Sequence, residues 1–415
     1  MTRRYSIGSY LTGAVAARAG DEMSGPALML AGFALSGSTA EASLLLAGIT
    51  FSSAAGGPLL GVLLDRRARP GRLLAGALLG YAVGLGVILA GLGRLPFAVT
   101  VLIAVLTGLP APALSGGWTA QLPRVVPAER LPRANALDAM TFSLASLTGP
   151  ALAGGVAEAL GAPSAVGVSA VLIGLAMPAA WLLPAHPGRT RGVRETPPSV
   201  ITDLAAGMRV IVRNSRLARA TFTSVVCCAA QGMLAACVPL LGERVLGGYG
   251  RGAVLLSCAA VSALVANAVL ARFPRSLAPD TIIWAGSLVQ AAALALAASG
   301  RPVVLAIAMF MAGIGEGPQL TVLFAVRHRE VPEQLRGQIF TTGASLKITG
   351  FAVGAAIGGQ GAARSLPGTL AAAAGVAVLA AVVFFVIPSG TPRGGARPDS
   401  ASCRRPTGPV ARPRG

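Results

Sequence analysis

Long apolar segments recur along the chain, and each one is long enough to cross the hydrocarbon core of a membrane. In lipid, every backbone N–H and C=O group must be bonded within the protein, so segments of this length fold as helices. The sequence therefore predicts an all-α integral membrane protein with twelve transmembrane helices and with both termini on one side. The predicted spans are residues 7–35, 43–64, 73–93, 97–120, 137–160, 164–183, 218–241, 252–271, 281–299, 302–326, 338–360 and 366–387.

The chain has too few charged residues to cover a water-soluble fold. Only 12% of its 415 residues are charged, whereas soluble domains carry about 25%. Its 54 glycines and 29 prolines suit closely packed and kinked membrane helices. The formal net charge of +19 lies mainly in the predicted loops and the tail. This placement predicts contact with anionic lipid headgroups rather than with nucleic acid.

Arginine is divided unevenly between the two predicted faces of the membrane. One face carries 27 arginines, and the other carries only Arg94, Arg244, Arg251, Arg301 and Arg364. Lys and Arg accumulate on the cytoplasmic side, so we expect a multi-pass protein of the inner (plasma) membrane with both termini in the cytoplasm. The start of the chain, with Arg3 and Arg4, imitates a secretory signal. Its apolar segment continues to about Leu35, however, and the count of spans requires it.

Between Pro184 and Arg219 the composition shifts from apolar residues to proline, arginine and polar residues. Within this stretch, Val200–Val212 has the apolar spacing of a helix that lies along a membrane surface. The sequence therefore predicts four regions. They are an N-terminal six-helix bundle at 1–183, a cytoplasmic linker with a surface helix at 184–217, a C-terminal six-helix bundle at 218–388, and a disordered basic tail at 389–415.

The two halves of the chain repeat with an offset of 205 residues. Each half contains six predicted spans, so the two copies have the same orientation in the membrane, as in transporters built from a parallel duplication. The aligned pairs are Gly108 with Gly313, Val126-Pro127 with Val331-Pro332, Gly149 with Gly354, and Gly154 with Gly359.

A short basic loop joins the second and third spans. The residues that match the pattern G-x-L-a-D-r-x-G-r are Gly61, Leu63, Asp65, Arg66 and Arg69. On this pattern the loop resembles the helix 2–3 signature of the major facilitator superfamily. Ala68 replaces its second glycine, and Pro70 stands where a basic residue is usual. The resemblance implies two six-helix bundles that alternate access around a midplane site, with Gly61, Asp65, Arg66 and Arg69 as the gating loop.

We expect Asp65 to lie beside Gly337 and Gln338, at the start of the eleventh span, when such a transporter faces outward. There its carboxylate can accept hydrogen bonds from the free N–H groups of a helix N-terminus and can offset the helix dipole. The contact is lost when the two halves part, so it biases the alternating-access equilibrium.

Three further segments resemble the multidrug and macrolide efflux branch of this superfamily. Two are Val126–Ala136 and Val331–Gly337, and the third is Gly149-Pro150-Ala-Leu-Ala-Gly154-Gly155. The third is similar to the G-P-x-x-G-G motif of proton antiporters, with one extra residue in the spacing. Small residues permit close helix packing and Pro150 kinks the helix, so a packing role and a gating role both remain open. The span 97–120 carries no charge, so the scheme of antiporters that have an arginine there is not carried over.

The first span contains three charged residues, Arg18, Asp21 and Glu22. Their spacing places both carboxylates near Arg18 on adjacent helix faces, so one interpretation is a self-neutralising cluster. Charges inside a span are rare and mark substrate or proton pathways. We therefore favour Asp21 and Glu22 as part of a substrate or proton site, and Gly20-Asp21 also resembles a recurrent feature of the efflux branch.

Two opposite charges occur in the tenth and eleventh spans. Glu316 lies ten residues before the end of its span, and Lys347 lies nine residues after the start of the next. At about 1.5 Å per residue, both lie about 14–15 Å from the same membrane face. Lys347 is also the only lysine in the chain. We therefore expect these two residues to pair in at least one state and to couple protons to transport. Gln231 and Gln290 are expected as interhelical hydrogen bonds or as ligand contacts.

The sequence lacks the motifs of several other classes of protein. A nucleotide phosphate loop requires a lysine after a glycine-rich turn, and the single lysine is not in one. We therefore expect no cofactor, with a proton gradient as the energy source. His186 and His328 fall in separate predicted loops, so no metal site is expected. Cys227, Cys228, Cys237 and Cys258 lie in predicted spans and are expected to be small buried hydrophobic residues, whereas Cys403 lies in the predicted tail.

Together these patterns predict a monomeric secondary active transporter. Its expected activity is the export of a hydrophobic or amphiphilic small molecule, such as a drug or secondary metabolite, in exchange for protons. An uptake permease for a small metabolite is the alternative transporter. A polytopic membrane enzyme would need acid, base or metal residues that converge near one face, and the sequence shows none. A sensor that does not transport is also compatible with the sequence.

Overall fold

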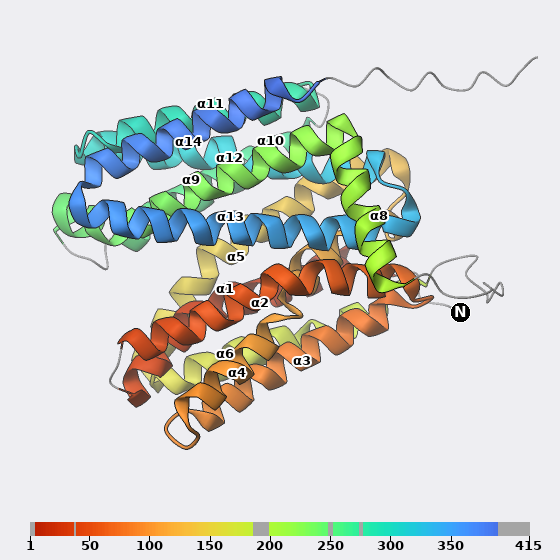
Figure 1. The fold of residues 1–415 in the computed structure, drawn as a ribbon, viewed down its shortest axis with the longest axis horizontal. Helices are drawn as coiled ribbons and strands as arrows, with labels where there is room; N and C mark the ends of the chain where they lie inside the picture. The colour runs from red at the N-terminus through yellow and green to blue at the C-terminus, as the bar shows by residue number, and fades with distance from the viewer. Residues whose placement is uncertain (1–4, 37–38, 186–198, 248–251, 274–276, 389–415) are drawn as a thin grey trace, which may run out of the picture.

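The structure is a computed structural model that describes residues 5–36, 39–185, 199–247, 252–273 and 277–388. Its long helices lie in two groups, one from each half of the chain (Figure 1). The first group contains α1 (Ile7–Ser36), α2 (Thr39–Arg66), α3 (Pro70–Gly91), α4 (Phe97–Gly108), α5 (Leu131–Leu160), α6 (Ala162–Leu175) and the short α7 (Met177–Trp181). The second group contains α9 (Ser215–Leu246), α10 (Gly252–Arg272), α11 (Pro279–Ala297), α12 (Pro302–Glu330), α13 (Arg336–Arg364) and α14 (Leu366–Val386).

Short helical turns complete the described chain. A π-helix at Ala113–Gly117 extends the span that begins with α4. Two 3-10 turns, Leu122–Arg124 and Ala128–Arg130, precede α5, and a third, Glu333–Leu335, precedes α13. We call the end of the bundles at which α2 passes into α3 and α12 into α13 the basic end, because it carries residues 66–72 and 327–336.

Eleven helical segments of the described chain are long and apolar enough to span a membrane. The twelfth spanning helix is α1, which has 30 residues but also carries Arg18, Asp21 and Glu22. It packs against α5 and α6, and its residues Ala14 and Ala17 are fully buried. A helix with three charges is therefore accommodated in the interior of the first bundle, and the predicted all-helical architecture is confirmed.

Each half has its own apolar core. In the first half, aromatic side chains such as Tyr10, Tyr81 and Trp118 are at most 1% exposed and pack among leucines and alanines. In the second half, two clusters of apolar side chains fill the space among α9, α11, α12 and α14. A smaller cluster joins the halves, with Ala120 and Ala139 from the first and Phe324 and Phe340 from the second. We call this smaller cluster the bridging cluster.

The internal repeat is also seen in the glycines at which two helices pack closely. A Cβ atom on Gly108 would overlap the carbonyl of Ile49 and the hydroxyl of Ser52. Its repeat partner, Gly313, would in the same way overlap the carbonyl of Ala259 and the hydroxyl of Ser262. Close approach of two backbones needs a residue without a side chain. The two six-helix units therefore share packing geometry as well as sequence, as a parallel duplication predicts.

The predicted linker helix is present as α8 (Val200–Arg213) and crosses the ends of the long helices (Figure 1). Ser199 caps it, because its side chain accepts a hydrogen bond from the N–H of Thr202 at 3.1 Å. Three apolar side chains of α8 point outward, with exposed fractions of 76%, 42% and 56% for Ile201, Met208 and Val212. The linker segment before α8 and the tail after residue 388 lie outside the described residues.

Candidate functional site

The basic end is closed by a carboxylate that caps a helix of the opposite half. Asp65, at the end of α2, accepts hydrogen bonds from the backbone N–H groups of Gly337 at 2.7 Å and of Gln338 at 2.8 Å. Leu335, the residue before α13, provides no side-chain cap. Gly61 allows the approach, because a Cβ there would overlap the backbone of Gln338. This is the contact predicted from the sequence.

The arginines of the gating loop behave differently from Asp65. Arg66 forms an ion pair of 2.8 Å with Asp203 of α8, and both side chains are about one-third exposed. Gln338 donates from Nε2 to the carbonyls of Asp203 at 2.9 Å and of Leu204 at 3.2 Å. Helix α8 therefore contacts both halves beside the Asp65 cap. Arg69 is exposed and lines an open surface hollow with Arg67 and Arg72.

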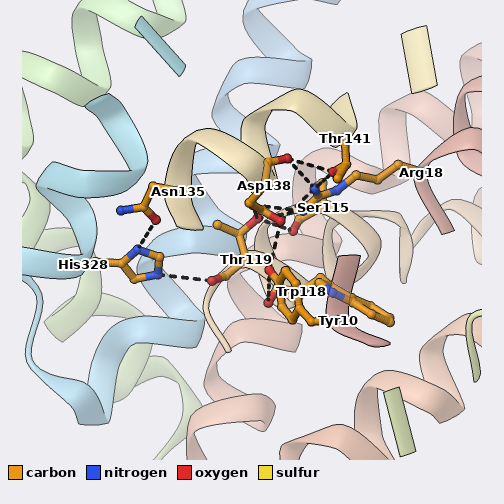
Figure 2. Close-up of polar contacts among 9 residues, drawn as sticks. All are labelled: Tyr10, Arg18, Ser115, Trp118, Thr119, Asn135, Asp138, Thr141 and His328. Carbon is orange, nitrogen blue, oxygen red and sulfur yellow. Dashed lines mark hydrogen bonds and ion pairs between the residues drawn. The ribbon is translucent and has the colours of Figure 1, made fainter. Parts of the chain in front are cut away.

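A second contact between the halves is made by His328, which the sequence analysis placed in a loop. That expectation is wrong, because α12 continues to Glu330 and holds the imidazole inside the protein. Nδ1 lies 2.9 Å from Oδ1 of Asn135, and Nε2 lies 3.1 Å from the carbonyl of Thr119 (Figure 2). The ring also packs on Phe340, with centroids 4.5 Å apart. His328 therefore joins α12 to the first half next to the bridging cluster.

The charge of Arg18 is compensated by a residue that the sequence analysis missed. Arg18 pairs with Asp138 of α5 at 2.9 Å, and the two side chains are 2% and 0% exposed (Figure 2). The guanidinium also donates to Thr119 at 2.8 Å and to Thr141. Tyr10 donates to the Asp138 carboxylate at 3.0 Å. The alternative in which Arg18 neutralises its own helix is therefore not what the structure contains.

Asp21 and Glu22 point in different directions. Asp21 is half-buried and interacts with Tyr81 of α3, inside the first bundle. Glu22 is exposed and accepts a hydrogen bond of 3.4 Å from Ser146 of α5. At this level α5 approaches α1 closely, because a Cβ on Gly149 would lie 2.6 Å from the Cβ of Glu22.

The fifth-span motif thus divides into two parts. Gly149 has the close-packing role that was one of its two predicted roles. Around Gly154 and Gly155 a Cβ would meet nothing within 4 Å, and Pro150 is exposed. A packing explanation is therefore sufficient for Gly149 alone.

Glu316 interacts electrostatically with Lys347 and with Glu22 of the opposite half. Glu316 is exposed on α12, Lys347 is half-buried on α13, and the two interact electrostatically. They form no direct ion pair within the described part of the chain. Glu316 also interacts with Glu22 of the opposite half. Three charged residues on three helices therefore lie where the two halves face each other, away from the closed basic end.

Gln231 belongs to a chain of amide groups in the second half. Its Nε2 donates to Gln290 at 3.2 Å, and Gln290 donates in turn to Gln319 at 3.3 Å. Gln319 then donates to Ser287 at 3.0 Å and to the carbonyl of Ile283 at 2.9 Å. The predicted interhelical role of Gln231 and Gln290 is confirmed, and Gln319 is a further member that the sequence analysis missed.

Comparison with solved structures identifies the same architecture. The chain is similar to the human organic anion transporter MFSD10 (TETRAN), with a TM-score of 0.74, 16% identity, and coverage of 92% of this chain and 99% of that one. A bacterial homologue of the iron transporter ferroportin gives a TM-score of 0.71 at 16% identity, with coverage of 92% and 98%. The fucose:proton symporter of E. coli gives 0.68 at 15% identity, with coverage of 94% and 100%.

Sequence comparison gives the family directly. The family model described as Major Facilitator Superfamily matches residues 10–293. An uncharacterized MFS-type transporter, y4rN of Sinorhizobium fredii (strain NBRC 101917 / NGR234), is 30% identical over 339 residues, which are 80% of this chain and 82% of that protein. The chain therefore belongs to the major facilitator superfamily of membrane transporters.

Proposed function

We propose that the protein exports an amphiphilic small molecule in exchange for protons by alternating access. The observation that carries the proposal is the electrostatic interaction between Glu22 and Glu316, which are exposed carboxylates on opposite halves and lie away from the closed basic end. Two carboxylates in electrostatic contact repel each other, and a proton on either one removes the repulsion. Lys347 adds a positive charge that interacts with Glu316. Proton binding can therefore change the balance of charge between the halves.

The arginine distribution supports a cytoplasmic location for the basic end. On that assignment the described conformation is closed to the cytoplasm by the Asp65 cap and the His328 contacts. The exposed apolar face of α8 then lies at the cytoplasmic membrane surface, where such helices bind the interface and where basic residues attract anionic lipid.

Topology gives the first prediction. Cys403 lies outside the described residues, in the tail that we assign to the cytoplasm. A membrane-impermeant maleimide should label it only after the inner membrane of spheroplasts has been permeabilised. Substitution of Cys403 by serine provides the control for labelling of the other cysteines. Labelling of Cys403 in intact spheroplasts would refute the orientation.

Replacement of Asp65→Asn should keep expression but lower transport, and should shift the resting population toward the state open at the basic end. An amide retains one acceptor oxygen but places a donor against the second backbone N–H group, so one charge-assisted bond of about 1.5–3 kcal/mol is lost. Cysteine accessibility along α13, with and without the substitution, measures the shift. Asp203→Asn is the matched control, because its ion pair is about one-third exposed and contributes about 1 kcal/mol or less. Wild-type turnover in Asp65→Asn would remove the gating role.

The function itself is tested by accumulation of a panel of radiolabelled and fluorescent compounds in cells with and without the protein. An exporter lowers accumulation of its substrate, and a protonophore abolishes the difference. Glu22→Gln and Glu316→Gln should abolish it as well. Glu243→Gln, an exposed position near the far end of α9, should not. Raised accumulation of a compound would instead identify the uptake permease.

A further inference from the structure

The second half contains a buried cation that no carboxylate of the described residues neutralises. Arg327 of α12 is 2% exposed. Its Nε and Nη2 atoms have no hydrogen-bond partner among the described residues. Its guanidinium interacts electrostatically with the thiol of Cys228 and lies over the ring of Phe340, but it pairs with no carboxylate of the described residues. A buried charge without a partner is strongly unfavourable, so it signals a role that the folded chain does not itself fulfil.

The first half shows how this protein treats a buried arginine when the purpose is structural. Arg18 is also 2% exposed, but both its terminal nitrogens bond to Asp138 or to threonine hydroxyls. The 205-residue repeat offset relates Asp138 to Gly343. A Cβ on Gly343 would overlap the guanidinium of Arg327. In the second half, the cation therefore lies against the position at which the first half carries its carboxylate.

The unpartnered atoms of Arg327 have a specific geometry. Nε and Nη2 form one edge of the planar guanidinium, and their N–H groups point in parallel. This edge matches two oxygens on one centre, as in a carboxylate, better than it matches a spherical halide. We propose that this edge of Arg327 binds the carboxylate of an organic anion, which makes amphiphilic carboxylates the substrate class of the transporter. The inference rests on the proposed transport function and specifies its substrate.

The surroundings of Arg327 suit a ligand with a charged head and an apolar body. Cys228 interacts electrostatically with Lys347 as well as with Arg327, so an anion beside this thiol is within reach of two cations. Glu316 also interacts with Cys228, so the surroundings of this thiol contain two positive charges and one negative charge. The aromatic ring of Phe340 has its centroid 5.6 Å from the guanidinium carbon and offers an apolar surface.

Access to Arg327 follows from the contacts that close the basic end. The next residue, His328, is bonded to Asn135 and Thr119 of the first half. Phe340 packs on both His328 and Phe324. When the halves part at the basic end, these contacts to the first half are lost and Arg327 is uncovered. The anion therefore binds from the basic end, in the conformation that opens there.

Binding of benzoate to the purified full-length protein in detergent tests the proposal without any ion gradient. Benzoate replaces chloride at constant ionic strength. The dependence of the thermal midpoint on benzoate concentration gives the apparent dissociation constant. We expect benzoate to stabilise the wild-type protein. Arg327→Gln should weaken benzoate binding at least about tenfold, the equivalent of one lost charge-assisted bond. Arg327→Lys should fall between the two, because a lysine keeps the charge but lacks the fork.

The unliganded variant separates a binding role from a packing role. Removal of an uncompensated buried charge should leave the thermal midpoint of Arg327→Gln equal to or above that of wild type. Arg329→Gln, whose side chain is half exposed and paired with Glu330, should bind benzoate as wild type does. A lipid phosphate could also occupy the fork, so the stabilisation by added phosphatidylglycerol is measured in parallel, and we expect it to be the same in wild type and Arg327→Gln.

Three results would overturn the proposal. They are a wild-type midpoint that does not respond to benzoate, undiminished benzoate binding in Arg327→Gln, and a phosphatidylglycerol effect that depends on Arg327 while the benzoate effect does not. Absence of proton-driven transport in a wild-type protein that binds benzoate would contradict the coupling mechanism alone. Intact transport without Arg327-dependent binding would contradict the substrate class alone.

Discussion

Replacement of Asp138→Asn should destabilise the protein by about 3–5 kcal/mol, the range for breaking one partner out of a buried ion pair. The side chain is 0% exposed and accepts bonds from Arg18, Tyr10 and Thr119. An amide group would place a donor against these donors and leave the charge of Arg18 uncompensated. The thermal midpoint of the purified protein and its yield in the membrane measure the effect.

A second substitution shows whether the loss comes from the charge. The double change Arg18→Met with Asp138→Asn removes both charges and should recover most of the stability, since a buried pair adds little over an apolar replacement of similar size. Asp203→Asn, which breaks a partly exposed pair, should change stability by about 1 kcal/mol or less. If the losses from the two single changes in the Arg18 and Asp138 pair simply add, the ion pair is not what holds α1 against α5.

The largest expected effect on activity comes from Glu316 and Lys347. Glu316→Gln should abolish proton-driven transport, because it removes the proposed proton acceptor and leaves Lys347 without the carboxylate that interacts with it. Lys347→Met should leave an uncompensated carboxylate in the same place. The double variant should recover expression and thermal stability better than either single variant, although not coupling. Interacting residues show non-additive effects of about 0.5–3 kcal/mol.

All four proteins of this cycle are measured for expression, thermal midpoint and proton-coupled flux. Glu243→Gln serves as the control for a lost carboxylate outside the group that joins the halves. Strictly additive effects would show that Glu316 and Lys347 do not interact, and coupling would then have to rest on Asp21 and Glu22.

The spans could be predicted because hydrocarbon leaves the backbone no alternative to a helix. The Asp65 cap could be predicted for a similar reason, since a helix N-terminus needs acceptors and Asp65 ends the neighbouring span. Both arguments concern backbone N–H and C=O groups, whose need for hydrogen-bond partners can be read from the local sequence. Neither depends on the exact rotation of one helix against another.

The pairing of Arg18 with Asp138 depends on such a rotation. The spacing of residues within α1 placed two carboxylates near Arg18, but its long side chain reaches α5 instead. The signal available in the sequence was Asp138 itself, an acidic residue at the start of an apolar segment that needs a partner. His328 was misplaced because the apolar run ends near Val326, whereas α12 continues for one more turn.

Several contacts between the two halves lie together at the basic end, and this has a consequence for leakage. Asp65 accepts hydrogen bonds from two backbone N–H groups of α13, and His328 contacts two groups of the first half. Further along α13, Ser345 donates to the carbonyl of Ser53. Because these contacts lie side by side in one interface, they must break together before the halves can part. The thermal fluctuation of a single helix is therefore not enough to open this end to water. If transport is coupled to protons as proposed, we expect the idle protein to stay closed at this end, so that the proton gradient is used only by complete transport cycles.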